Sequence, residues 1–168
     1  NILFSEFNVF YPNINLTHSY LDTRVKDATL PSVSDPINIS GNRLPYAPQD
    51  TYTIGIEHQL LSEIKFRIDY RYVGEVYTDF ENTESGEDEI GESLGISGPV
   101  PDYALWSASG SYQLSSQFKF FLSAKNITDE IYIGSRLHSN PGQPDANISS
   151  GILPGPRRQI NIGFEYNF

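Results

Sequence analysis

Hydrophobic and polar residues alternate along the chain with a period of two, most clearly at its end. From position 160 onward every even position is apolar, namely Ile160, Ile162, Phe164, Tyr166 and Phe168. The odd positions between them are Asn, Gly, Glu and Asn. Because successive side chains of a β-strand point to opposite faces, this pattern predicts a strand with one apolar face and one polar face.

The same alternation occurs in five stretches upstream, each close to the roughly nine to eleven residues that a tilted strand needs to cross hydrocarbon. The stretches are 13–20, 51–59, 65–72, 106–115 and 118–125. Phe121 is the exception, an aromatic residue on a polar face. The pattern therefore predicts six strands, and Ile2 and Phe4 indicate the end of a seventh.

The predicted strands are joined by connections of alternating length. Residues 60–63 and 114–117 are tight turns, whereas roughly 28–49, 81–102 and 135–156 are long loops. Long loops are uncommon in compact domains and usually mark a functional surface. Short turns at one end and long loops at the other are typical of an up-and-down outer-membrane barrel, with its loops outside the cell.

The number of strands predicts a piece of a larger barrel. Bacterial barrels have an even number of strands, and seven strands entered midway cannot close. An open sheet in lipid would leave two edges of unpaired backbone groups, each costing several kcal/mol. We therefore expect residues 1–168 to form part of a barrel wall whose other strands belong to a longer parent protein.

Composition and charge remove several other classes of protein. A content of 38% hydrophobic and 13% aromatic residues indicates packed structure, and 13 Gly with 11 Pro disfavour long helices. The absence of cysteine excludes a disulfide framework and a thiolate site. The net charge of −10 argues against nucleic-acid binding. The mean hydropathy of −0.37 also suits a barrel, because lipid-facing and lumen-facing residues average out.

The charged residues of the predicted strands all fall on the polar face. A Lys or Arg facing lipid would cost about 2–4 kcal/mol at the bilayer midplane. Their segregation predicts that the polar face borders a wet lumen or a polar plug. The residues are Glu57, Lys65, Arg67, Asp69, Arg71, Lys119, Lys125 and Glu165.

No catalytic or metal-binding constellation stands out. The stretch 79–92 holds seven acidic residues and no basic one, but its spacing matches no calcium loop, so we interpret it as a solvated loop. The three histidines, His18, His58 and His138, show no metal-ligand spacing. No nucleophile with a base and no paired carboxylates recur, so we expect neither an enzyme nor a resident cofactor.

Five short motifs resemble those of TonB-dependent outer-membrane receptors, and they occur in the family's order. Asn126-Ile127-Thr128-Asp129 with Tyr132 resembles the family's Asn-Leu-Phe-Asp-x-x-Tyr, with Thr128 departing from the usual Phe. The others are Gly155-Pro156-Arg157, Leu44-Pro45-Tyr46-Ala47-Pro48, Tyr20-x-Asp22 and Val100-Pro101-Asp102-Tyr103. Together they are most similar to the ferric-citrate branch of the family.

The resemblance implies an all-β, antiparallel, 22-stranded transmembrane barrel of which this chain is the C-terminal part. It implies an N-terminal plug with a TonB box, neither of which is in this sequence. Such receptors bind ferric citrate or other siderophores and import them with energy from the TonB complex. The implied surroundings are outer-membrane lipid, lipopolysaccharide and the barrel-assembly machinery.

Two sets of residues are candidates for function. Guanidinium groups suit carboxylate-rich ligands, so arginines at the loop bases and polar loop residues are candidate ligand contacts, although rim arginines also pair with barrel carboxylates. They are Arg43, Arg136, Arg157, Arg158, Asn140, Gln143 and Asn147. The apolar face of the last strand is first a lipid-facing surface, and the resemblance also implies a membrane-insertion signal read by strand addition. Its residues are Ile160, Ile162, Phe164, Tyr166 and Phe168.

Other functions remain open from the sequence. The receptor could import another scarce nutrient such as cobalamin or a carbohydrate. An outer-membrane enzyme is a further alternative, as is a soluble β-sandwich binding module, in which the apolar faces would meet a second layer of protein.

Overall fold

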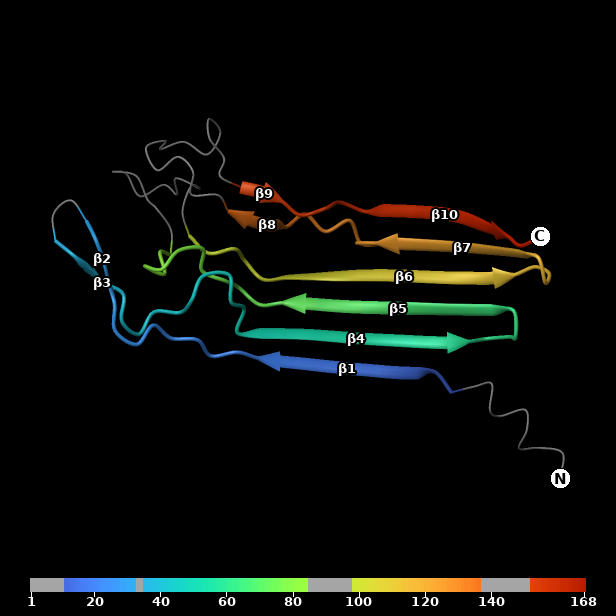
Figure 1. The fold of residues 1–168 in the computed structure, drawn as a ribbon, viewed down its shortest axis with the longest axis horizontal. Helices are drawn as coiled ribbons and strands as arrows, with labels where there is room; N and C mark the ends of the chain where they lie inside the picture. The colour runs from blue at the N-terminus through green and yellow to red at the C-terminus, as the bar shows by residue number, and fades with distance from the viewer. Residues whose placement is uncertain (1–10, 33–34, 85–97, 137–151) are drawn as a thin grey trace, which may run out of the picture.

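The computed structural model describes residues 11–32, 35–84, 98–136 and 152–168. Its main element is one antiparallel six-stranded sheet in a single layer, which is the predicted all-β meander (Figure 1). The strands are β1 (Asn13–Tyr20), β4 (Asp50–Gln59), β5 (Ile64–Val73), β6 (Tyr103–Gln113), β7 (Phe118–Lys125) and β10 (Gln159–Tyr166), in that spatial order. All six predicted strands are confirmed, whereas the predicted seventh near residues 1–5 lies outside the described residues.

Tight turns and long connections lie at opposite ends of the sheet, as predicted (Figure 1). The β4–β5 turn is closed by the Leu60 N–H, which donates to the Ile64 carbonyl at 3.0 Å. The β6–β7 turn is closed in the same way by Leu114 and Phe118 at 2.9 Å. We call the opposite end, where the long connections gather, the loop end.

Short ladders extend the long connections beyond the wall. In the first long connection, between β1 and β4 (21–49), β2 (Thr29–Leu30) pairs with β3 (Ile37–Asn38). In the second, between β5 and β6 (74–102), Val76 and Val100 form an isolated bridge. In the third, between β7 and β10 (126–158), β8 (Ile133–Arg136) pairs with β9 (Ile152–Pro154). The sequence pattern predicted these segments only as loops, because two to four residues are too few to display an alternation.

Strand register places even-numbered residues opposite even-numbered residues across the whole sheet. Ile54 lies between Leu16 and Tyr70, and Leu122 lies between Gly110 and Ile162. Since a slip by one residue would turn a strand's apolar side chains to the other face, this register creates one continuous apolar face.

The apolar face of the sheet is uncovered in the described part of the chain. Ile162 is 79% exposed and Leu16 is 70% exposed, and no second layer of described residues packs on them. This arrangement contradicts the β-sandwich alternative, which requires two sheets facing each other. Among the described residues, no helix is long and apolar enough to span a bilayer.

The buried hydrophobic residues lie at the loop end, where Val73 is the last residue of β5, and Gly55 is buried within β4 of the wall. The buried hydrophobic side chains of the described residues are Ile39, Val73, Val76 and Val100. Buried Thr78 lies among the same connections and donates its hydroxyl to the Gly98 carbonyl at 3.0 Å. The small core therefore stabilises the bases of the loops, while the strands rely on what borders their two faces.

Phe121, the one aromatic residue that breaks the alternation in β7, has a packing role. It lies opposite Gly163 of β10 on the polar face. A methyl group built on Gly163 would lie 2.3 Å from the Phe121 ring. The ring therefore covers the glycine of the neighbouring strand, an arrangement that stabilises pairing where a glycine leaves a gap.

Candidate functional site

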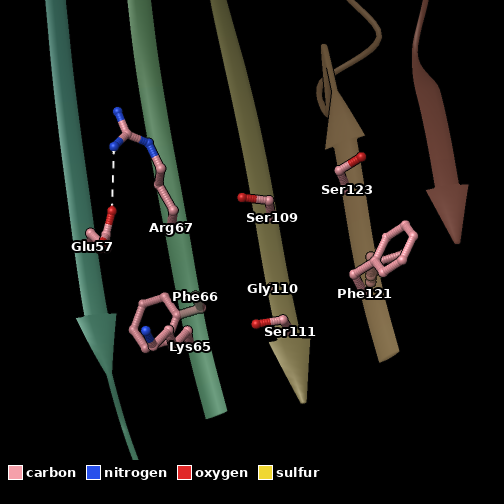
Figure 2. A pocket seen from close by; sticks show the side chains of 10 residues that line it. Glu57, Lys65, Phe66, Arg67, Ser109, Gly110, Ser111, Phe121 and Ser123 are labelled. Atoms are coloured by element: carbon pink, nitrogen blue, oxygen red, sulfur yellow. Dashed lines mark hydrogen bonds and ion pairs between the residues drawn. The ribbon is translucent and has the colours of Figure 1, made fainter. Parts of the chain in front are cut away.

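A hollow on the polar face of the sheet lies towards the turns (Figure 2). This lower hollow has a volume of about 340 Å³ and is bordered by β4 to β7. The Arg67 guanidinium binds the Asp69 carboxylate through two hydrogen bonds of 2.8 and 2.6 Å and reaches Glu57 at 3.5 Å. The positive charge of Arg67 in the lower hollow is therefore neutralised by carboxylates of the same sheet.

The second hollow lies on the same face next to the loop end and has a volume of about 430 Å³. We call it the upper hollow. Arg71 of β5, Ser107 of β6 and Lys125 of β7 border it, together with Gln159 at the start of β10 and Arg157 just before that strand. Every strand from β4 to β10 of the main sheet contributes to its lining, so its shape depends on the register of the whole wall.

Asn126 joins the two C-terminal motifs at the edge of the upper hollow. Its φ of 49° is left-handed, a conformation that asparagine tolerates, and its side chain is only 4% exposed. Its amide donates to the carbonyls of Glu130 at 2.9 Å and Pro156 at 3.0 Å, and its side-chain oxygen accepts from the Glu130 N–H at 2.8 Å. The end of β7 is thereby tied to the segment that leads into β10.

Asp129 supplies the second link between these motifs. Its carboxylate accepts hydrogen bonds from Arg157 Nε at 2.9 Å and Arg157 Nη2 at 2.6 Å, and from the Arg158 backbone N–H at 3.0 Å. The hydrogen bonds from Arg157 and then from the Arg158 backbone hold the pKa of the Asp129 carboxyl well below its usual range. A two-pronged pair of this kind fixes orientation as well as charge.

Tyr132 supplies the third link by packing against Gly155. A methyl group on Gly155 would lie 2.0 Å from the Tyr132 ring, so this position accepts no side chain without rearrangement. The ring also stacks on Tyr103 with centroids 4.3 Å apart, and burial raises the pKa of its phenol. Residues 126–132 and 155–158 thus form one structural unit, which we call the terminal clasp.

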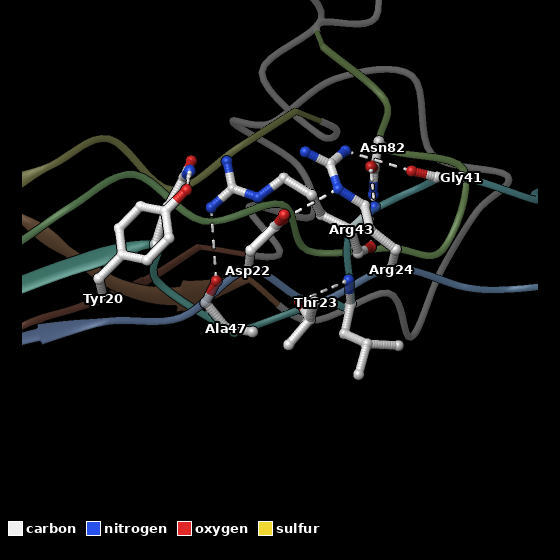
Figure 3. Close-up of polar contacts among 10 residues, drawn as sticks. Tyr20, Asp22, Thr23, Arg24, Gly41, Arg43, Ala47 and Asn82 are labelled. Carbon is white, nitrogen blue, oxygen red and sulfur yellow. Dashed lines mark hydrogen bonds and ion pairs between the residues drawn. The ribbon is translucent and has the colours of Figure 1, made fainter.

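Arg43, a predicted ligand contact, is anchored in the first long connection. Its backbone N–H donates to Asn82 at 2.7 Å, and the Asn82 amide returns a hydrogen bond to the Arg43 carbonyl at 2.9 Å. Its guanidinium reaches the Ala47 carbonyl at 3.5 Å (Figure 3). The same group lies over the Tyr77 ring, 5.6 Å from its centroid. Arg43 therefore joins the first connection to the second.

Neighbouring contacts in Figure 3 hold the same connection in place. Arg24 donates to Asp22 at 2.9 Å and to the Gly41 carbonyl at 3.2 Å, and the Tyr20 hydroxyl accepts from Gln49 at 2.8 Å. The Tyr20-x-Asp22 motif thus ends β1 by fixing the chain that leaves it.

Arg136 joins the third long connection to the other two. The Tyr46 hydroxyl donates to the Arg136 carbonyl and accepts from its N–H, and Arg136 Nε reaches the Pro99 carbonyl at 3.4 Å. Burial lowers the pKa of the Arg136 guanidinium. The three long connections are therefore linked to each other at the loop end.

The predicted ligand contacts do not form one cluster in the described structure. Arg157 and Arg158 meet at Asp129, whereas Arg43 and Arg136 lie in other contacts. Asn140, Gln143 and Asn147 lie outside the described residues. The sequence placed Arg71 and Lys125 on the polar face without singling them out, because only the fold shows that they border the same hollow.

No metal centre is formed by the described residues. They contain no group of three or more His, Cys, Asp or Glu side chains placed to hold an ion. Of the acidic stretch 79–92, only residues 79–84 are described. In this part, the Glu84 carboxylate accepts a hydrogen bond from the Tyr77 hydroxyl at 2.8 Å, which raises the pKa of that phenol.

Comparison with known proteins finds one family and one fold. A family model described as TonB dependent receptor-like, beta-barrel, matches residues 4–127. The solved siderophore receptor PiuA from Acinetobacter baumannii aligns with 92% of this chain at a TM-score of 0.68 and 17% identity. The closed form of the ferric-catecholate import receptor Fiu from E. coli K12 aligns with 94% at 0.61 and 17% identity. The unliganded ferric citrate transporter FecA aligns with 76% at 0.58 and 24% identity.

The family match confirms the predicted family, and the likeness to the solved receptors confirms the predicted fold. The chain spans 19%, 19% and 18% of the lengths of the three solved receptors, respectively, so it corresponds to about a fifth of each.

The Asp129–Arg157 pair predicts a pH dependence of stability. Because the folded pKa of Asp129 is depressed, its contribution is complete above the unfolded value of about 3.9 and is lost as the pH falls below it. We expect Asp129→Asn to lower the thermal midpoint of the whole receptor near pH 7, with the difference from wild type shrinking between about pH 5 and pH 3. Thermal unfolding of both proteins at each pH tests this. A difference that stays constant over that range would contradict it.

Proposed function

Because the chain belongs to the TonB-dependent receptor family through its β-barrel domain, we propose that residues 1–168 form the C-terminal part of the barrel of an outer-membrane transport receptor. The whole receptor binds a ferric chelate, such as ferric citrate or another siderophore, at its extracellular loops. It imports the chelate with energy from TonB through an N-terminal plug. The family consists of transport receptors and not of enzymes, so the ferric chelate is a substrate and no cofactor is required.

The main support for this proposal is the family match, which covers most of a sheet with one exposed apolar face. Such a face is suited to acyl chains, and the charged residues of the six wall strands lie on the opposite face except Asp50 at the loop end of β4, whose carboxylate lies 2.9 Å from His18. The proposal places outer-membrane lipid and lipopolysaccharide against the apolar face. It places the turns in the periplasm and the loop end outside the cell.

The choice of a ferric chelate is supported by what the similar solved proteins are called. They are a siderophore receptor, a ferric-catecholate import receptor and a ferric citrate transporter. The candidate contacts remain Arg43, Arg136, Arg157 and Arg158 with Asn140, Gln143 and Asn147. All four arginines already bind groups of their own chain, so contact with a ligand would require them to share or exchange these partners.

Uptake of iron from ferric citrate tests the proposed function. The whole receptor is expressed in an iron-starved bacterium that lacks its own ferric citrate receptor, in matched strains with and without functional TonB. We expect radioactive iron to accumulate only when both the receptor and TonB are present. Uptake of cobalamin or a carbohydrate in place of iron would assign another nutrient, and absence of any TonB-dependent uptake would contradict the transport role.

The end of the last strand is proposed to serve as the membrane-insertion signal. Its outward side chains are Ile160, Ile162, Phe164, Tyr166 and Phe168, and they are all exposed. Tyr166 packs on Phe118 with centroids 4.6 Å apart, and Phe168 meets the Tyr166 ring edge-on at 5.0 Å. An exposed strand with free backbone groups along its edge can be recognised by strand addition, which is the proposed mode of contact with the barrel-assembly machinery.

Deletion of Phe168 is expected to lower the amount of receptor in the outer membrane, because the strand loses its terminal aromatic group. Asn167→Ala is the matched control, since it alters the neighbouring inward position and keeps Phe168. Quantitative immunoblots of outer-membrane fractions compare the two variants with wild type. Equal amounts of all three proteins would rule out a role for the terminal aromatic residue.

A further inference from the structure

Positive charge is unbalanced at the upper hollow. Of the charged groups that border it, Asp69 is paired with Arg67, and Arg157 is paired with Asp129. Arg71 and Lys125 border the same hollow, and within the described part of the chain neither side chain makes an ion pair or a hydrogen bond. Two cations without a partner in the described part of the chain therefore border the upper hollow, although the net charge of the chain is −10.

The register explains why no wall residue neutralises these two cations. Arg71 lies opposite Thr53 on one side and Leu105 on the other, and Lys125 lies opposite Gln159. No carboxylate occupies a directly paired position, in contrast to Arg67, which lies opposite Glu57. Like charges that share a hollow repel each other, and an anion bound between them removes that cost.

We propose that the upper hollow is a carboxylate-binding site in which Arg71 and Lys125 are the charged contacts. A guanidinium can hold both oxygens of a carboxylate, and an ammonium adds a point charge. Ser107 and Gln159 in the same lining can donate further hydrogen bonds. The carboxylate belongs either to the imported chelate, in which case the inference rests on the proposed function, or to another part of the receptor that fills the barrel.

The unpaired cations are better placed for this role than the arginine of the terminal clasp. Arg157 uses Nε and Nη2 to bind Asp129 at 2.9 and 2.6 Å, so a ligand carboxylate would have to displace an existing partner. Arg71 and Lys125 are exposed on the inner face and have no such partner to displace in the described structure. An incoming carboxylate therefore meets no competing intramolecular pair at these two residues.

The test uses the whole receptor with Arg71→Gln, Lys125→Gln and the double variant. Lys65→Gln is the matched control, because Lys65 is an exposed inner-face cation that borders the lower hollow. Arg71→Lys keeps the charge and should restore much of any loss. Two quantities are measured for each protein: the affinity for ferric citrate by equilibrium binding, and the thermal midpoint without ligand.

If the chelate supplies the carboxylate, each glutamine variant binds ferric citrate roughly tenfold more weakly while the thermal midpoint is unchanged. If the receptor's own chain supplies it, the thermal midpoint falls on the order of 1–2 °C and the affinity is unchanged. Either result supports the proposed site, provided that Lys65→Gln does not show it. If neither quantity changes, or Lys65→Gln changes both equally, the inference is wrong.

Failure of the inference is distinguishable from failure of the proposed function. A wild-type receptor that binds no ferric citrate contradicts the proposed ligand, and the thermal midpoints then decide the inference by themselves. If the glutamine variants bind ferric citrate as strongly as the wild-type receptor and have the same thermal midpoints, the proposed function stands and the proposed site is wrong.

Discussion

The structure depends on the coupling between strand register and the two-residue period of the side chains. Backbone hydrogen bonds align even positions with even positions across six strands, so every apolar row faces the same way. A single slipped strand would expose charged residues such as Arg67 and Asp69 on the apolar face. The resulting uncovered apolar face is suited to hydrocarbon, which agrees with the barrel fold of the family.

This constraint separates the strands of the wall from the loop end, where the proposed function places ligand recognition. In the described part of the chain few residues of the wall strands are buried, whereas the loop end carries the buried hydrophobic side chains, the terminal clasp and the contacts that join the three long connections. Arg157 illustrates the difference. Its pair with Asp129 stabilises the base of a loop. The inner-face cations Arg71 and Lys125 make no ion pair within the described part of the chain.

The sequence predicted what depends on local periodicity and missed what depends on contacts between distant segments. The six strands, the two tight turns and the sidedness were predictable, because alternation is visible within each stretch. The hydrogen bond from Asn126 to Pro156 spans 30 residues, and the chain alone carries no signal for such a pairing. The role of Phe121 required the position of Gly163 in the neighbouring strand, and the ladders of the long connections were too short to show a period.

The most direct test of the account compares Ile162→Lys with Asn161→Lys in the whole receptor folded in lipid bilayers. The two residues are adjacent in β10 and point to opposite faces, so the same new charge meets lipid in one variant and the inner face in the other. The account predicts that Ile162→Lys lowers the free energy of unfolding by about 2–4 kcal/mol and that Asn161→Lys changes it little. Equal losses in the two variants, or a larger loss for Asn161→Lys, would contradict it.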